Sequence, residues 1–167
     1  MKDLIRRALK KDGDAFVELM ELHKQSMYKV AKSYLRREED AADAIAETIL
    51  DCFEHLDSLK EPAYFTTWLI RILINNCKDL LKKSEIMSCM EDTGFLEDRA
   101  AAGDDREFVR LLEPLDEETR LIMTLYYASG FTTKEIGSML ELKESTVKSR
   151  IRRGKQKLKA EFFSSIA

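Results

Sequence analysis

Apolar residues recur every three or four positions through most of the first 83 residues, as they do on one face of an α-helix. The pattern predicts one helix over about Asp14–Tyr34, capped by Asp14, and a second over about Glu38–Leu56. A third is predicted over about Ala63–Lys83, with Pro62 near its start, where the missing N–H costs little. Sustained periodicity is absent from residues 84–105.

A helix-turn-helix is predicted near the C-terminal end. Thr132 and Glu135 have the spacing of a capping box, which starts a helix, and residues 141–143 make a short break. A second helix begins near Glu144. Three apolar residues on one of its faces are expected to be buried: Val147, Ile151 and Leu158. A helix, a three-residue turn and a basic second helix are typical of a motif that enters the major groove of DNA.

These elements predict an all-α protein with two small helical domains, residues 1–83 and 106–167, joined by a flexible linker over residues 84–105. The composition agrees, because 35% of the residues are charged and only six Gly and two Pro interrupt the helices. No apolar run reaches the roughly 18 residues of a membrane span, and the charged N-terminal segment does not resemble a signal peptide. A cytoplasmic location without membrane insertion is expected.

The cysteines and histidines do not suggest a metal, a cofactor or a disulfide framework. Cys52, Cys77 and Cys89 are odd in number and share no close spacing, and only His23 and His55 could join them. Two core thiols and one linker thiol are expected. The sequence shows no set of nucleophile, base and orienting residue and no glycine-rich phosphate loop, so the chain is not expected to be an enzyme.

Charge is distributed unevenly along the chain. The net charge is −3, yet residues 84–105 carry one basic and seven acidic side chains, and residues 143–159 carry eight basic and one acidic. Residues 1–83 are balanced, with 15 of each sign. Such segregation indicates that the C-terminal part of the chain binds a polyanion.

An acidic stripe lies along the second predicted helix, where five carboxylates recur at helical spacing: Asp40, Asp43, Glu47, Asp51 and Glu54. A like-charge pair such as Asp43–Glu47 costs about 0.2–0.5 kcal/mol, and no Lys or Arg lies between Glu38 and Leu59 to offset it. The stripe is either a solvated face or a docking face for a basic partner, and the missing cations favour docking. The opposite face is expected to be buried and comprises Ala42, Ile45, Ile49, Phe53 and Leu56.

A cationic stripe follows on the third predicted helix, opposite an apolar face that includes Phe65 and Leu69. Its members fall within about 80° of one another at roughly 100° per residue: Thr67, Arg71, Asn75, Lys78 and Lys82. These side chains can donate to phosphates and exposed base edges. Lys60 and Tyr64 precede the helix, and an aromatic beside cations can stack on single-stranded bases. Trp68 is expected to belong to the core.

The second helix of the helix-turn-helix supplies the candidate duplex contacts: Lys143, Glu144, Ser145, Thr146, Lys148, Ser149, Arg150, Arg152, Arg153 and Lys155. Its first turns would meet base edges and its later cations would meet phosphates. The alternative is a basic helix that is only solvated. Agreement between the capping box, the turn and the apolar face favours DNA binding.

Together these segments resemble the extracytoplasmic-function sigma factors of bacteria, a branch of the sigma-70 family, over nearly the whole chain. Arg36–Thr48 is similar to the family's polymerase-binding segment, and Phe65–Ile72 is similar to its promoter-melting helix. Leu115–Tyr127 and Glu144–Arg150 are similar to its C-terminal domain. Two departures are Lys60–Ala63 and Glu141, at places where the family often has Gly.

The resemblance implies a factor that binds core RNA polymerase and directs promoter-specific transcription initiation, with a role in an envelope-stress response. The acidic stripe would contact the clamp helices of the β′ subunit. The residues Asp57–Tyr64 and the helix after them would capture single-stranded bases of the minus-10 element, and the helix from Glu144 would read the minus-35 element as duplex. The acidic linker would run near the RNA exit path. A membrane-anchored anti-sigma factor would regulate the protein.

Two other functions fit parts of the sequence. An ordinary DNA-binding regulator would use the helix-turn-helix on duplex alone and would leave the acidic stripe without a role. A helical adaptor would need no DNA, and replacing Arg150 and Arg153 would then leave promoter output unchanged. Binding to core polymerase distinguishes the first of these from the sigma-factor interpretation.

Overall fold

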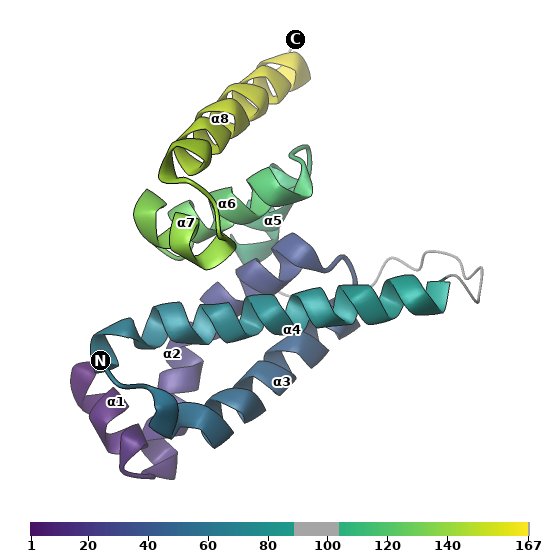
Figure 1. Ribbon diagram of the computed structural model, residues 1–167. Coiled ribbons are helices and arrows are strands. Elements are labelled where there is room, and N and C mark those ends of the chain that lie inside the picture. Colours follow the sequence, from purple (N-terminus) through teal and green to yellow (C-terminus); the bar gives the residue numbers. More distant parts are fainter. Residues whose placement is uncertain (89–103, 167) are drawn as a thin grey trace. The chain divides into compact units, whose positions relative to one another are not determined.

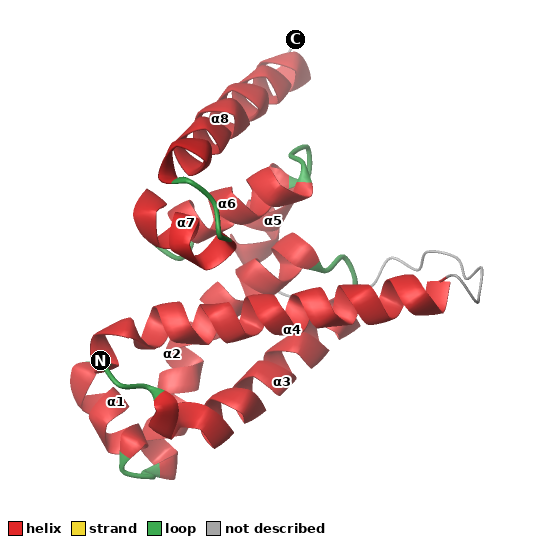
Figure 2. Ribbon diagram, in the orientation of Figure 1, coloured by secondary structure: helices red, strands yellow, loops and turns green. Residues whose placement is uncertain are grey.

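The computed structural model describes residues 1–88 and 104–166, which are helical apart from short connections (Figures 1 and 2). The chain divides into two compact units, Met1–Arg99 and Ala100–Ala167. The predicted all-α class is confirmed. Most of the predicted linker lies outside the described residues. The third predicted helix runs on to Ser88, five residues beyond its expected end.

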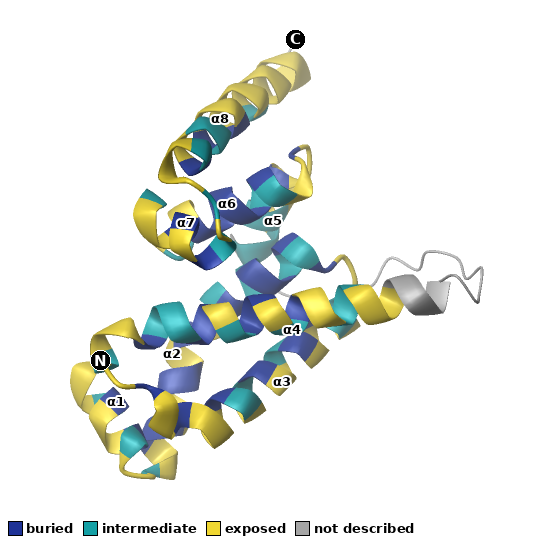
Figure 3. Ribbon diagram, in the orientation of Figure 1, coloured by how far each residue is buried: buried dark blue, intermediate teal, exposed yellow. Residues whose placement is uncertain are grey.

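Within residues 1–88, the N-terminal unit has four α-helices and two short 3-10 helices: α1 (Lys2–Leu9), α2 (Gly13–Tyr34), α3 (Glu38–His55), η1 (Leu56–Ser58), η2 (Pro62–Tyr64) and α4 (Phe65–Ser88). Helices α2, α3 and α4 pack against one another, and α1 packs against α2. Their shared core is apolar and fully buried, as at Leu19, Val30, Leu69 and Leu73 (Figure 3). Each such side chain contributes roughly 1.5–3 kcal/mol by leaving water.

The start of α2 corrects one prediction. Asp12, and not Asp14, is the N-cap, because its carboxylate accepts the Ala15 backbone N–H at 3.1 Å. The Arg7 guanidinium donates to the same carboxylate at 2.8 Å, so α1 contributes to the cap. Asp14 occupies the first turn, where a negative charge favours the helix dipole without capping it.

The buried face of α3 also differs from the prediction. Phe53 and Ala42 are exposed, and Ile45 and Ile49 are only half-buried, although Leu56 is buried as expected. The side chains that α3 buries are small: Ala41, Ala44, Thr48 and Cys52. The buried face of α3 therefore lies beside the acidic stripe and not opposite it. Its small side chains let α3 approach its neighbours closely.

The two described cysteines are core thiols, as predicted. Cys52 on α3 and Cys77 on α4 are fully buried and free. Burial raises the pKa of each thiol to about 12. Cys89 lies outside the described residues.

The C-terminal unit comprises α5 (Asp104–Leu112), α6 (Glu117–Tyr127), α7 (Thr133–Leu140) and α8 (Glu144–Ile166). Helix α8 packs against both α6 and α7. Val147 and Ile151 are buried as expected, whereas Leu158 is half-buried. Gly154 lets α8 approach α6, because an added Cβ would lie 3.0 Å from the Thr119 methyl group. No helix in the described ranges is both long and apolar enough to cross a membrane.

Candidate functional site

The acidic stripe of α3 is largely open to solvent. Asp43, Glu47 and Glu54 are exposed, and Asp40 and Asp51 are half-buried. Among the described residues, no Lys or Arg forms an ion pair with any of the five. No cation among these residues therefore offsets their mutual repulsion, which favours the approach of a cationic surface.

Exposed apolar side chains adjoin the stripe on the same helix. Leu50 is 57% exposed and Phe53 is 62% exposed. The Phe53 ring contacts the Phe16 ring edge-on, at 5.3 Å between centroids. A surface that combines large apolar groups with uncompensated charge has the composition of a protein-binding face.

One member of the stripe is tied to the neighbouring helix. Asn76 of α4 donates its side-chain N–H to the Asp51 carboxylate at 2.9 Å and to the Thr48 hydroxyl at 3.2 Å. The Thr48 hydroxyl in turn donates to the Ala44 carbonyl. Sequence reasoning did not identify Asn76, which fixes the acidic helix in register with the cationic helix.

The cationic stripe of α4 is presented as expected. Arg71, Asn75, Lys78 and Lys82 are exposed, and Thr67 is half-buried near the start of the helix. Before the helix, Lys60 is exposed and Tyr64 is 65% exposed. The seven side chains therefore follow one another from the connection between α3 and α4 along most of α4.

A buried histidine anchors the start of α4. His23 of α2 is 5% exposed, and its Nδ1–H donates to the Leu19 carbonyl at 2.8 Å. Its Nε2 then accepts the Thr66 hydroxyl at 3.1 Å. The Phe65 ring packs edge-on against the imidazole at 5.4 Å. His23 thus fixes the helix end that follows Tyr64, a role for which the sequence offered no signal.

Trp68 is not a simple core residue. It is half-buried and lines an open pocket of about 320 Å³ between α3 and α4. The other lining residues are mostly polar: Asp51, His55, Ile72, Asn75 and Asn76. The pocket combines an aromatic wall with amide donors and acceptors, which is the chemistry that recognises a flat polar ring.

The helix-turn-helix forms as predicted. The Thr132 hydroxyl accepts the Glu135 backbone N–H, and the Glu135 carboxylate accepts the Thr132 backbone N–H at 2.8 Å. That backbone hydrogen bond lowers the pKa of Glu135. Glu141 takes the left-handed conformation, with φ 57°, where the motif often has Gly. The turn is tight enough that a Cβ on Gly137 would lie 2.8 Å from the Leu142 carbonyl oxygen.

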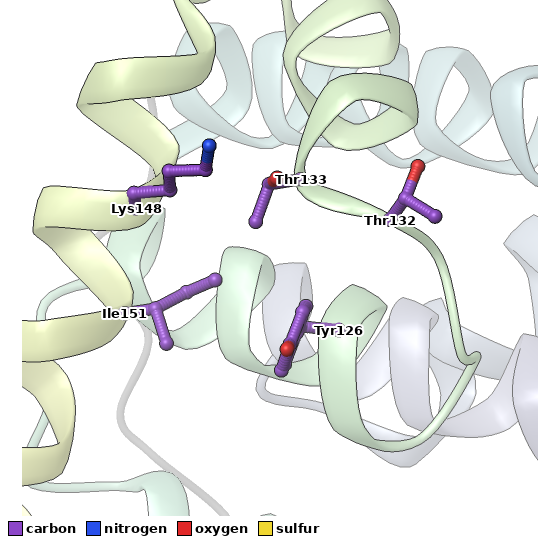
Figure 4. Close-up of a pocket in the computed structure, with 5 residues that line it drawn as sticks. All are labelled: Tyr126, Thr132, Thr133, Lys148 and Ile151. Carbon is purple, nitrogen blue, oxygen red and sulfur yellow. The ribbon is translucent and has the colours of Figure 1, made fainter.

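The N-terminal turns of α8 are positioned by contacts with α7. Glu144 accepts the Thr133 hydroxyl at 2.8 Å and pairs with Lys148 at 2.8 Å. The hydrogen bonds from Lys148 and Thr133 lower the pKa of Glu144. Lys148, Thr133 and Tyr126 meet around an open pocket of about 380 Å³ (Figure 4). The Lys148 ammonium group at this opening has three donor protons, so it can also donate to a phosphate oxygen.

Most candidate duplex contacts on α8 and just before it face solvent. The exposed ones are Lys143, Glu144, Ser145, Lys148, Arg152, Arg153 and Lys155. Thr146 and Ser149 are half-buried. The Lys155 ammonium lies over the Tyr127 ring at 5.5 Å, which restrains that side chain.

Arg150 is engaged within the unit. Its side chain is 30% exposed and pairs with Asp116 at 3.1 Å and with Glu118 at the start of α6. Asp116 also caps α6 by accepting the Thr119 backbone N–H at 3.1 Å. Partial burial opposes ionisation of Asp116, but hydrogen bonds from Thr119 and the charge of Arg150 bring its pKa below the usual value. Arg150 therefore fastens α8 to α6.

Each of the two units matches a known protein family. Sigma-70 region 2 matches residues 19–85, and Sigma-70 region 4 matches residues 105–158. ECF RNA polymerase sigma factor SigM of Mycobacterium tuberculosis is 30% identical over 150 residues, covering 88% of this chain and 76% of that protein. ECF RNA polymerase sigma factor SigW of Bacillus subtilis is 25% identical over 177 residues, covering 95% of each chain.

Solved structures share the fold. CnrH, in complex with the cytosolic domain of CnrY, has a TM-score of 0.70 and 23% identity over 98% of this chain and 97% of that chain. The sigma factor RpoE of Bartonella quintana, in complex with the anti-sigma factor NepR, has a TM-score of 0.74 and 23% identity. This match covers 87% of the present chain and 94% of the RpoE chain.

Proposed function

Because this chain belongs to the extracytoplasmic-function sigma factors of the sigma-70 family, which direct RNA polymerase in transcription initiation, we propose that three of its surfaces divide that task. The observation that carries the proposal is the joint exposure of charges of opposite sign on separate helices. Asp43 and Glu47 are exposed on α3, whereas Lys148 and Arg152 are exposed on α8. A protein that binds duplex DNA alone has no use for the first pair.

The acidic stripe of α3 contacts the clamp helices of the polymerase β′ subunit. Its members are Asp40, Asp43, Glu47, Asp51 and Glu54. Three of them are exposed without an ion pair within the described ranges, and Leu50 and Phe53 add apolar area next to them. The charges steer the encounter, and the apolar groups supply most of the buried area.

The second surface captures the non-template strand at the minus-10 element. It comprises Lys60, Tyr64, Thr67, Arg71, Asn75, Lys78 and Lys82. Stacking an unpaired base on an exposed aromatic contributes about 1–3 kcal/mol, which offsets a few kcal/mol of unstacking. The Trp68 pocket supports this role, because its aromatic wall and the exposed Asn75 amide suit an extruded base. The polymerase, and not this chain, carries out the chemistry.

The third surface is the exposed part of α8, which reads the minus-35 element as duplex. Lys148 and Arg152 lie one turn apart on the solvent side and suit phosphate or guanine contacts. Residues 1–83 then act as region 2, residues 106–167 as region 4, and residues 84–105 as an acidic linker through the polymerase.

An anti-sigma factor is part of the proposal. The structure of CnrH contains the cytosolic domain of CnrY. The structure of RpoE from Bartonella quintana contains the anti-sigma factor NepR. A membrane-anchored partner that covers these surfaces until envelope stress occurs would keep this cytoplasmic protein inactive.

Transcription in vitro with purified core polymerase tests the proposal. The wild-type chain is expected to support initiation at defined start sites, and Asp43→Asn/Glu47→Gln is expected to weaken core binding about tenfold, equivalent to about 1.4 kcal/mol. Glu18→Gln/Glu21→Gln removes the same charge from exposed positions on α2 and is the matched control. A chain that ignores core polymerase yet binds promoter duplex tightly would instead be an ordinary regulator.

A further inference from the structure

Helix α1 has an exposed cationic face that lies outside the matched families, since the region 2 match begins at residue 19. The helix buries Ile5 and Ala8 against the unit. Its other side, continued past the helix end, carries four exposed cations: Lys2, Arg6, Lys10 and Lys11. The segment is therefore amphipathic, with its charge directed to solvent.

The unit itself does little to neutralise this cationic face. Arg7 forms an ion pair with Asp12 at 2.7 Å. Arg6 forms a longer ion pair with Asp3, at 3.7 Å, and both of these side chains are highly exposed. Within residues 1–88 and 104–166, no carboxylate forms an ion pair with Lys2, Lys10 or Lys11. Cations near the helix C-terminus favour the dipole, but Lys2 at the N-terminus opposes it.

The position of α1 identifies the partner. The helix packs against α2, η1 and η2, so it flanks the connection that carries Lys60 and Tyr64 (Figure 1). That connection begins the proposed single-strand surface. Continuity with a DNA-binding surface and a matching charge sign both favour a nucleic-acid backbone over an acidic protein.

We infer that the cationic face of α1 binds the sugar–phosphate backbone of the promoter strand next to the bases captured at η2 and α4. The inference rests on the proposed function and extends its minus-10 surface by one helix. Each phosphate contact on single-stranded DNA adds about 0.7 to the salt-dependence slope of log K. Three contacts therefore account for a slope of about 2.

Promoter binding by the reconstituted holoenzyme, titrated at several salt concentrations, tests the inference. Lys2→Gln/Arg6→Gln/Lys10→Gln is expected to make the slope shallower by about 2 and to leave core binding unchanged. The control is Lys2→Arg/Arg6→Lys/Lys10→Arg, which retains all three charges at the same sites and is expected to behave as wild type. All three positions are exposed, so the helix is expected to remain folded, as circular dichroism would verify.

Each outcome separates the two proposals. If the wild-type holoenzyme binds its promoter and the triple Gln variant shows the same slope, α1 does not contact DNA. If the variant loses core binding in a pull-down without DNA, the face binds polymerase and the inference is overturned. If the wild-type chain does not direct core polymerase to any promoter, the proposed function fails whatever α1 does.

Discussion

Arg150→Ala is expected to destabilise the C-terminal unit, because the Arg150 side chain holds α8 against α6 and does not serve mainly as a DNA contact. The guanidinium pairs with Asp116 and Glu118, and the Arg150 side chain is only 30% exposed. A hydrogen bond to a charged group contributes about 1.5–3 kcal/mol when buried, and an exposed ion pair contributes about 0.2–1 kcal/mol. The partly exposed pair at Arg150 falls between these limits, at about 1–2 kcal/mol.

Native-state hydrogen exchange on the full-length protein measures this loss. A loss of 1–2 kcal/mol corresponds to roughly 5–30-fold faster exchange of the amides in α6 and α8. Arg150→Lys keeps the charge but cannot donate to two carboxylates in a fork, so it is expected to restore protection only in part. Arg152→Ala, at an exposed position on the same helix, is the control and should leave exchange unchanged while weakening duplex binding.

The reasoning would be refuted by the opposite pattern. If Arg150→Ala leaves exchange in α6 and α8 at the wild-type rate but weakens duplex binding as strongly as Arg152→Ala does, Arg150 is a direct DNA contact. The contacts with Asp116 and Glu118 would then contribute little to stability.

Three further predictions concern packing, thiol reactivity and pH. Gly137→Ala is expected to destabilise the helix-turn-helix by about 1–3 kcal/mol, because the new Cβ would lie 2.8 Å from the Leu142 carbonyl oxygen; urea unfolding would measure the loss. Cys52 and Cys77, whose pKa burial raises to about 12, should resist iodoacetamide at pH 8 in the folded protein and react in urea, as peptide mass spectrometry would show. Glu135 has a lowered pKa in the folded state, so its contribution to stability is present above its ordinary pKa and is lost as the pH falls through the lowered value; acid titration followed by circular dichroism would test this.

Local features of the fold were predictable from the sequence. The capping box at Thr132 and Glu135, the break before Glu144 and the burial of Val147 and Ile151 all depend on side chains within about one or two helical turns. The exposed charges of α3, α4 and α8 were predictable for the same reason, because helical spacing decides which side chains share a face.

The predicted burial of α3 was wrong at Ala42 and Phe53, because periodicity alone does not say which face meets the core. The acids were expected to lie opposite the buried face, but Asp51 borders it and bonds to Asn76. Small residues at Ala41 and Ala44 are buried, while the larger Phe53 is exposed. Packing against α2 and α4 decided this rotation of the helix.

The sequence by itself determined the helices, the helix-turn-helix and the separation of negative and positive faces, because these follow from interactions between residues a few positions apart. Only the tertiary structure decided that His23 meets Thr66, that Asn76 meets Asp51 and that Arg150 meets Asp116. Those pairs are 43, 25 and 34 residues apart. Such contacts depend on how whole helices pack, and no local pattern of residues encodes them.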